Sequence, residues 1–212
     1  GYVKAFNDSL QHNFTPIYYL ADKFDVVRTD VETLLPTEFN TGMNTITSAV
    51  LRFKKNKRMV VIMNTQLWSR FDKEKKGSNF AKVDQVKQLV TLADSLRRGF
   101  DVPYLVTGDM SSTLSMYPMK QLMIAAYVPA VWKASSKDFR SGYHDCSLLN
   151  GYSRNQRFKD APRGMNALSH IFVGNIKEAD RTLKVQAFGR IMPEFVLPLS
   201  PFAPCYADFW VR

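Results

Sequence analysis

The sequence predicts an α/β fold: a four-layer α/β sandwich in which two packed mixed β-sheets are flanked by helices. Three observations predict it. The first third of the chain has a hairpin pattern, one long amphipathic helix is followed directly by an apolar strand, and strand patterns return near the end. The 212 residues show no internal repeat, low-complexity run or linker, so we expect a single domain over residues 1–212.

The first part of the chain is predicted to form β-hairpins. Residues 1–14 show no clear period. Strands are then predicted at residues 16–20, 24–35, 44–54 and 58–67. The last two form the clearest hairpin, because apolar and polar side chains alternate on both sides of the basic turn 55–57.

A helix is predicted next, because apolar side chains fall at helical spacing on one face: Val83, Val86, Val90, Ala93 and Leu96. This helix spans residues 80–98, and an apolar strand at 102–107 and a second helix at about 118–127 follow. Residues 132–165 are polar and basic, and we expect them to be irregular apart from a turn or two of helix near 144–149. Strands return at residues 168–173, 182–188 and 204–211.

The composition is that of a globular protein with a basic surface. Apolar residues make up 45% of the chain and charged residues 23%, and the net charge is +10. A positive excess attracts polyanions such as nucleic acid, acidic lipid or acidic protein surfaces. No apolar run approaches the roughly 20 residues of a membrane-spanning helix, so we expect no membrane span. The cellular compartment stays open.

The strand at 58–67 delivers two amide side chains to its carboxyl end. Its period of two places Asn64 and Gln66 on one face, and Met63 and Thr65 on the other. Ligand sites of α/β proteins are usually built at this end of the strands. Asn64 and Gln66 are therefore candidate site residues, and ordinary loop hydrogen bonds are the alternative interpretation.

Four short stretches resemble, in chain order, motifs of the endonuclease/exonuclease/phosphatase superfamily, the DNase-like metal-dependent phosphoesterases. The motifs N-T-H-L, G-D-x-N, D-x-I-F and S-D-H-x-P correspond here to Asn64–Leu67, Gly108–Ser111, Ser169–Phe172 and Ser200–Pro204. Residues 15–19 also resemble the strand before the family's first motif pair, and residues 141–145 its later loop. The match extends over nearly the whole chain, so the resemblance implies the sandwich fold.

The resemblance also implies a chemistry, in which Mg or Mn and a ring of polar side chains polarise a phosphate ester and a held water attacks it. Of six motif positions for this chemistry, only Asp109 keeps the family's side chain. The substituted positions are Gln66 for the histidine, Ser111 for the asparagine, Ser169 for the aspartate, and Pro201 and Phe202 for the closing Asp-His pair. Gln66 cannot carry a proton, and Asp109 alone is a poor site for a hard cation. We therefore interpret Asp109 and Asn64 as inactive remnants of a catalytic site, and we expect no metal and no cofactor.

This interpretation favours a catalytically inactive phosphoesterase-fold domain, a pseudoenzyme that acts as a binding or structural subunit of a larger assembly. Its basic surface would face an anionic partner such as RNA or an acidic protein. The alternative is an active Mg-dependent phosphodiesterase, phosphatase or nuclease, with a site rearranged around Asp109 and helped by Asn64, His170 or His144. His170 directly follows the substituted position, so in a regular strand it faces the opposite way, as a core or surface histidine. A sugar- or lipid-binding module is a third possibility, for which the sequence offers nothing specific.

The start of the chain departs from the family pattern. The resemblance places the family's first strands, with a metal-binding glutamate, some tens of residues upstream of the match at residues 15–19, where only fourteen residues stand here. We therefore expect a sandwich that is incomplete at the N-terminus. Open strand edges and apolar faces favour pairing, so we also expect another polypeptide or an upstream segment to cover the open side.

Overall fold

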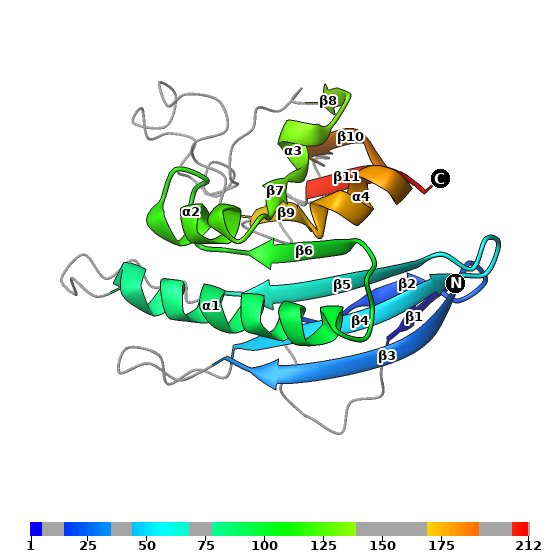
Figure 1. The fold of residues 1–212 in the computed structure, drawn as a ribbon, viewed down its shortest axis with the longest axis horizontal. Helices are drawn as coiled ribbons and strands as arrows, with labels where there is room; N and C mark the ends of the chain where they lie inside the picture. Colours follow the sequence, from blue (N-terminus) through cyan, green and yellow to red (C-terminus); the bar gives the residue numbers. More distant parts are fainter. Residues whose placement is uncertain (6–14, 35–43, 68–77, 139–168, 191–204, 212) are drawn as a thin grey trace, which may run out of the picture.

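The computed structural model describes residues 1–5, 15–34, 44–67, 78–138, 169–190 and 205–211. Its centre is a six-stranded mixed sheet in the order β3-β4-β5-β6-β9-β7 (Figure 1). The strands of this large sheet are β3 (Phe24–Thr33), β4 (Thr45–Phe53), β5 (Met59–Gln66), β6 (Tyr104–Asp109), β7 (Val128–Pro129) and β9 (Ser169–Gly174).

The large sheet is built from the predicted hairpins and one crossover. β3 pairs antiparallel with β4, and β4 pairs antiparallel with β5. β5 then pairs in parallel with β6, and the connection between them contains helix α1 (Ser78–Arg97). β9 returns antiparallel to β6. The predicted hairpin, helix and following strand are therefore confirmed.

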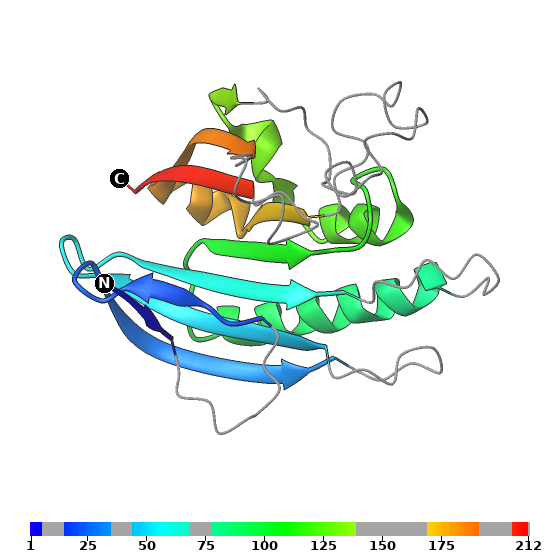
Figure 2. The same cartoon turned by 180° about the vertical axis from the view of Figure 1, so that it is seen from behind.

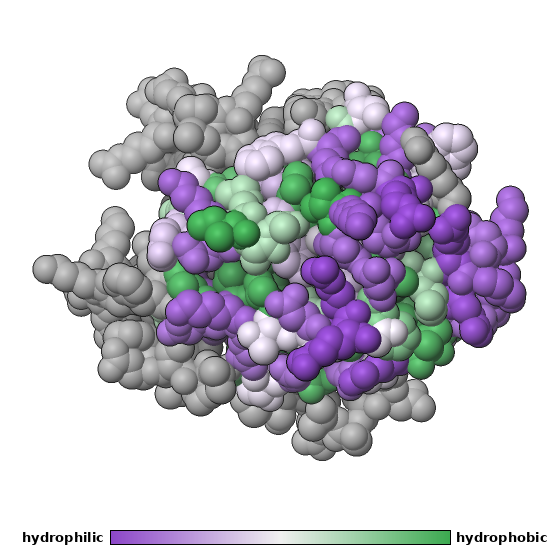
Figure 3. Space-filling view, viewed as in Figure 1, coloured by the Kyte–Doolittle hydropathy of each residue, from purple (hydrophilic) through white to green (hydrophobic). Residues whose placement is uncertain are grey.

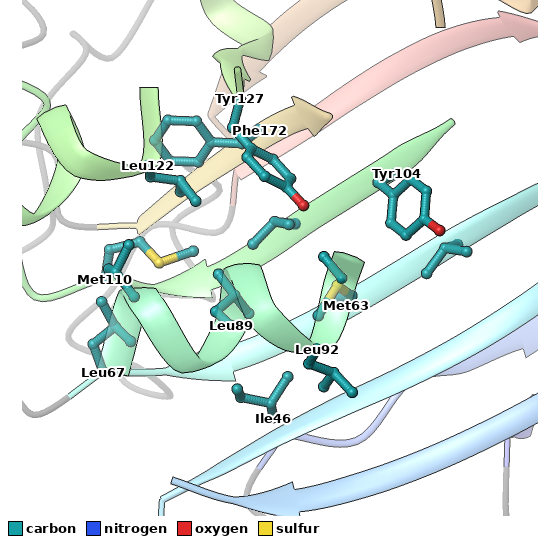
Figure 4. Packing of buried hydrophobic residues seen from close by; sticks show 14 of the residues in the cluster. Ile46, Met63, Leu67, Leu89, Leu92, Tyr104, Met110, Leu122, Tyr127 and Phe172 are labelled. Carbon is teal, nitrogen blue, oxygen red and sulfur yellow. The ribbon is translucent and has the colours of Figure 1, made fainter. Parts of the chain in front are cut away.

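Helices cover one face of the large sheet. α1 and α2 (Tyr117–Ile124) lie over it, and their apolar side chains form a buried core with the strands (Figures 1 and 4). Val86 and Leu89 of α1 meet Val61 and Met63 of β5 in this core. The apolar stripe predicted for the helix is buried except for Val90, which is half-buried, and it fixes α1 against the sheet.

Two smaller sheets lie against the opposite face (Figure 2). One is β1 (Tyr2–Lys4) with β2 (Tyr18–Leu20), and the other has the order β11-β10-β8. The remaining elements are β8 (Ser136–Asp138), β10 (Leu183–Arg190), β11 (Cys205–Val211), α3 (Ala130–Lys133) and α4 (Ile176–Thr182). A second apolar core joins these elements to the large sheet. The predicted α/β sandwich is confirmed.

The sequence-based prediction missed five short elements, of which β7 is a strand of two residues paired with β9. β1 forms within residues 1–14, where no period was visible. Its strand conformation is stabilised by hydrogen bonds to β2, and it has no alternating apolar pattern of its own. α3 and β8 fall in the stretch 132–165, or just before it, that was predicted to be irregular. α4 precedes β10 and was not predicted. The turn of helix expected near 144–149 lies outside the described residues. No helix in the described part of the chain is long and apolar enough to cross a membrane.

Candidate functional site

The ends of three neighbouring strands bring predicted site residues together. In the parallel pairing of β5 with β6, Gln66 lies opposite Asp109, and in the antiparallel pairing of β6 with β9, Asp109 lies opposite Ser169. These three motif positions therefore share one row across the sheet. We call this row, together with Asn64 and Ser111, the rim.

Asn64 connects two parts of the fold. It lies on the same face of β5 as Gln66, while Met63, which precedes it, points into the core under α1. The Asn64 Oδ1 accepts a hydrogen bond from the Thr107 hydroxyl at 3.2 Å, and its Nδ2 donates to the Pro16 carbonyl at 3.3 Å. The amide therefore ties the segment before β2 to the large sheet.

Asp109 organises the turn that follows β6. Its Oδ1 accepts hydrogen bonds from the Ser111 backbone N–H at 2.7 Å and from the Ser111 hydroxyl at 3.2 Å. Gly108 before it has φ +139°, and a Cβ there would lie 1.8 Å from the Thr65 carbonyl oxygen. Only glycine permits this close approach of β6 to β5. The Gly-Asp pair thus has a structural task in addition to any chemical one.

Lys82 of α1 lies beside this turn and was not identified from the sequence. Its side chain is only 2% exposed, and its Nζ donates a hydrogen bond of 2.6 Å to the Ser111 carbonyl. Burial lowers the pKa of Lys82, and attraction to Asp109 partly opposes this shift. A signal was present, because Lys82, Val86 and Leu89 are spaced by four and three residues and so share the buried face of the helix.

His170 is a core residue. It is 1% exposed, and it lies on the opposite face of β9 from its neighbour Ser169, as the strand period predicts. One ring nitrogen, Nε2, is 2.9 Å from the Ser112 carbonyl oxygen, and the ring meets Phe172 edge-on at 5.8 Å. His170 therefore does not reach the face of the sheet on which Asp109 lies.

The rim is a poor match for the divalent cation that the family motifs imply. Within the described ranges, no three His, Cys, Asp or Glu side chains come together to hold a metal ion. Asp109 is the one carboxylate of the rim, it already accepts from Ser111, and the Lys82 ammonium lies close by. The Asn64 carbonyl oxygen already accepts from Thr107. Three further predicted positions lie outside the described residues: Pro201, Phe202 and His144.

Solved structures with a similar fold are known, although no similar sequence was found. No family model matches the chain, and no curated protein matches its sequence. Among solved structures, the chain is similar to an endonuclease/exonuclease/phosphatase from Bacteroides vulgatus, at 15% identity and a TM-score of 0.71, over 93% of this chain and 70% of the other. It is also similar to a mannosyl-6-phosphatase from Bacteroides thetaiotaomicron, at 15% identity and a TM-score of 0.67, over 92% and 70% of the two chains. A third similar structure is TDP2 from D. rerio in complex with a single-strand DNA product, at 13% identity and a TM-score of 0.60, over 99% and 76%. The fold is thus that of the endonuclease/exonuclease/phosphatase structures.

Proposed function

We propose that this chain, which has the endonuclease/exonuclease/phosphatase fold, is a catalytically inactive member of that fold that binds a polyanion as a subunit of a larger assembly. The proposal includes no bound metal and no cofactor. Its main support is the composition of the rim. The row Gln66, Asp109 and Ser169 has one carboxylate where the family motifs have two acids and a histidine.

The lost groups matter because each has a large effect on rate. A general acid or base typically contributes 10²–10⁴-fold, and a bound metal several kcal/mol of transition-state stabilisation. An amide at Gln66 and a hydroxyl at Ser169 can donate or accept hydrogen bonds, but they do not transfer protons near neutral pH. With Asp109 engaged in its own turn, little remains to activate a water molecule.

A basic cluster supports the polyanion part of the proposal. Lys55, Lys57 and Arg58 are exposed in and after the turn between β4 and β5, and Lys23 is exposed in the neighbouring turn before β3. We call these four residues the basic tip. None of the four forms an ion pair with a described residue, so their charges are available to a partner. Figure 3 shows hydrophilic residues gathered at this end of the molecule.

The basic tip and the rim lie at opposite ends of β5. Arg58 precedes the strand and Gln66 ends it, which separates them by roughly 25 Å at about 3.3 Å per residue. The proposed contact with an anion is therefore distinct from the place where the family motifs meet. TDP2, a structure with the same fold, is bound to single-strand DNA, which shows that the fold can accommodate a polyanion.

The exposed side of the small sheet supports a polypeptide partner. Tyr2 of β1 and Tyr18 of β2 are 74% and 58% exposed, on the face turned away from the large sheet. The two side chains lie diagonally across the strand pair, and exposed aromatic side chains on one face favour contact with another protein. The test is to isolate the chain with its native partners and to compare hydrogen exchange of the β1–β2 amides in complex and alone. Equal exchange rates would exclude this surface.

Turnover is the direct test of the inactive rim. The purified chain is incubated with generic phosphodiester and phosphomonoester substrates in Mg²⁺ or Mn²⁺, alongside Asp109→Ala. We expect no release of alcohol from the diester, and no release of phosphate from the monoester, above the buffer rate from either protein. Release that depends on the metal and disappears in Asp109→Ala would refute the proposal.

Salt dependence tests the basic tip. Binding of single-stranded RNA is measured by fluorescence anisotropy over a series of salt concentrations. If Lys55 and Lys57 each contact a phosphate, Lys55→Gln/Lys57→Gln lowers the slope of log K against log salt by about 1.4, or about 0.7 per contact. The control Lys87→Gln/Lys120→Gln removes the same charge from exposed positions elsewhere and leaves the slope within about 0.3 of the original. Equal losses in both variants, or binding that ignores salt, would contradict the assignment.

A further inference from the structure

A cavity at the other end of the large sheet from the rim lies between the end of α1, the end of α2 and the start of α4. Its volume is about 220 Å³. Its polar lining comprises Asp94, Arg97, Tyr104, Tyr127, Asn175 and Lys177. Neither the family motifs nor the proposed polyanion contact involves these residues.

A tyrosine whose ring is buried lines this cavity with its hydroxyl. Tyr127 is only 7% exposed, and its hydroxyl makes no hydrogen bond to any residue that the structure describes. Tyr104 beside it, by contrast, donates to the Phe100 carbonyl at 3.0 Å. Both rings can be followed in Figure 4. The Tyr127 hydroxyl is not among the fully enclosed unpaired polar atoms of the described residues, so it is open to the cavity and can donate to a ligand there.

The Tyr127 hydroxyl is a donor at neutral pH. Burial raises its pKa, and the nearby Asp94 and Tyr104 raise it further, while Arg97 has a smaller opposite effect. The phenol therefore keeps its proton, and its natural partner is an acceptor such as an anionic oxygen.

The charges around the cavity are unpaired. Arg97 of α1 and Lys177 of α4 are exposed at its opening, and neither forms an ion pair with a described residue. Asp94, one turn before Arg97, is also unpaired among these residues. Among these lining side chains two cations outnumber one carboxylate, and Asp101, which accepts from Asn175, adds a second negative charge beside the cavity. A guanidinium and an ammonium on one cavity suit the oxygens of a phosphate group.

The backbone holds this arrangement in place. Tyr127 follows Ala126, which has φ +64°, and the ring packs so closely over Gly174 that a Cβ there would lie 2.3 Å from it. Asn175, with φ +50°, donates from its Nδ2 to the Asp101 Oδ1 at 2.8 Å and to the Val102 carbonyl at 2.9 Å. The lining is therefore preorganised, which reduces the entropy lost on binding.

We propose that this cavity binds a small phosphomonoester that carries free hydroxyl groups. Arg97 and Lys177 contact the phosphate oxygens, the Tyr127 hydroxyl donates to an acceptor of the ligand, and Asp94 accepts from its hydroxyls. The volume equals that of about seven waters at about 30 Å³ each, which suits a short phosphorylated polyol rather than a nucleotide. This inference does not depend on the proposed function.

The experiment uses glycerol phosphate as the probe, titrated into the full chain and followed by calorimetry and by amide chemical shifts. We expect 1:1 binding, at least about fivefold tighter than inorganic phosphate because Asp94 favours a ligand with hydroxyl groups. The shift changes should centre on residues 94–97, 126–127 and 175–177. Tyr127→Phe keeps the ring over Gly174 and should weaken binding about tenfold, the effect of one lost hydrogen bond to a charged group.

Arg97→Gln changes an exposed side chain, so it tests the site even if the Tyr127 variant does not fold. It should weaken binding at least about tenfold, whereas the neighbouring Arg98→Gln, which does not line the cavity, stays within about twofold. A dissociation constant above about 10 mM for the original chain overturns the proposal. So does an equal loss in both arginine variants, which would indicate a general effect of charge, or binding that Arg97→Gln leaves unchanged.

Discussion

Replacing Lys82 by methionine tests the structure of the rim most directly. Methionine keeps an unbranched apolar stem but removes the ammonium that donates to the Ser111 carbonyl at 2.6 Å. The position is 2% exposed, so water cannot easily take the place of the lost donor. The turn after Asp109 therefore loses the contact that joins it to α1.

The expected magnitude comes from two opposing effects. A hydrogen bond from a charged donor contributes about 1.5–3 kcal/mol, and an unpaired buried carbonyl costs about 1–3 kcal/mol. Removing a buried charge relieves its desolvation cost, which offsets part of this loss. We expect Lys82→Met to lower the free energy of unfolding by about 2 kcal/mol, or the melting temperature by about 4–8 °C for a chain of this size.

The pH dependence provides a second, independent readout. Burial holds the pKa of Lys82 below its usual 10.5, so between that lowered value and 10.5 the unfolded chain binds more protons than the folded one. The free energy of unfolding therefore rises with pH in this window, and the stabilising contribution is complete above 10.5. Lys82→Met lacks this rise, so the difference between the two proteins should grow as the pH increases from 8 to about 10.5.

The assay is urea unfolding followed by circular dichroism at several pH values. Lys87→Met is the matched control, because Lys87 is exposed on the same helix and pairs with Asp84, three residues away. It should change stability by less than about 0.5 kcal/mol. The reasoning is refuted if Lys82→Met is as stable as the original chain, or if the difference between them shrinks as the pH rises.

Three further substitutions test other parts of the structure. Gly108→Ala should destabilise the fold by more than about 3 kcal/mol, because its Cβ would lie 1.8 Å from a backbone oxygen of Thr65; urea unfolding that matches the original chain would contradict the register of β5 and β6. Ala126→Gly should stabilise by about 1 kcal/mol, because alanine is strained at φ +64° and glycine is not; a loss of stability would contradict the left-handed end of α2. Burial raises the pKa of Tyr104 from 10.0 to about 12, so the unfolded chain loses this proton first and stability falls as pH rises through that range. In Tyr104→Phe the free energy of unfolding should fall less over this pH range, and the difference from the original chain should reach about 2–3 kcal/mol. Equal slopes of stability against pH for the two proteins would exclude this account.

Elements with a strong local pattern could be predicted from the sequence. The alternation on both sides of residues 55–57 predicted the hairpin of β4 and β5, and the apolar stripe predicted α1. In both cases the buried side chains recur along the sequence at the period of a strand or of a helix. β1, β7 and β8 have three residues or fewer, and their strand conformation depends on partners distant in the sequence. No local period specifies these three strands.

The site was predictable only in outline. Strand order and parallel pairing are enough to place Gln66 beside Asp109, and the motif spacing adds Ser169. Lys82 was missed because charged side chains are usually solvated and almost never fully buried unless they have a partner. Its partner, the Ser111 carbonyl, belongs to a turn whose position depends on the fold.

The retained motif aspartate of the rim has a structural reason to be there. Asp109 fixes the turn to Ser111, and the Leu67 backbone N–H donates to the Asp109 carbonyl at 2.9 Å, so the residue joins the ends of β5 and β6. Asn64, the other candidate, similarly ties β5 to Thr107 and Pro16. Side chains that hold strand ends together are costly to replace, whether or not chemistry takes place beside them. The presence of Asp109 and Asn64 is therefore weak evidence for catalysis, whereas Gln66 and Ser169, which occupy the same row without the family's ionisable groups, bear directly on it.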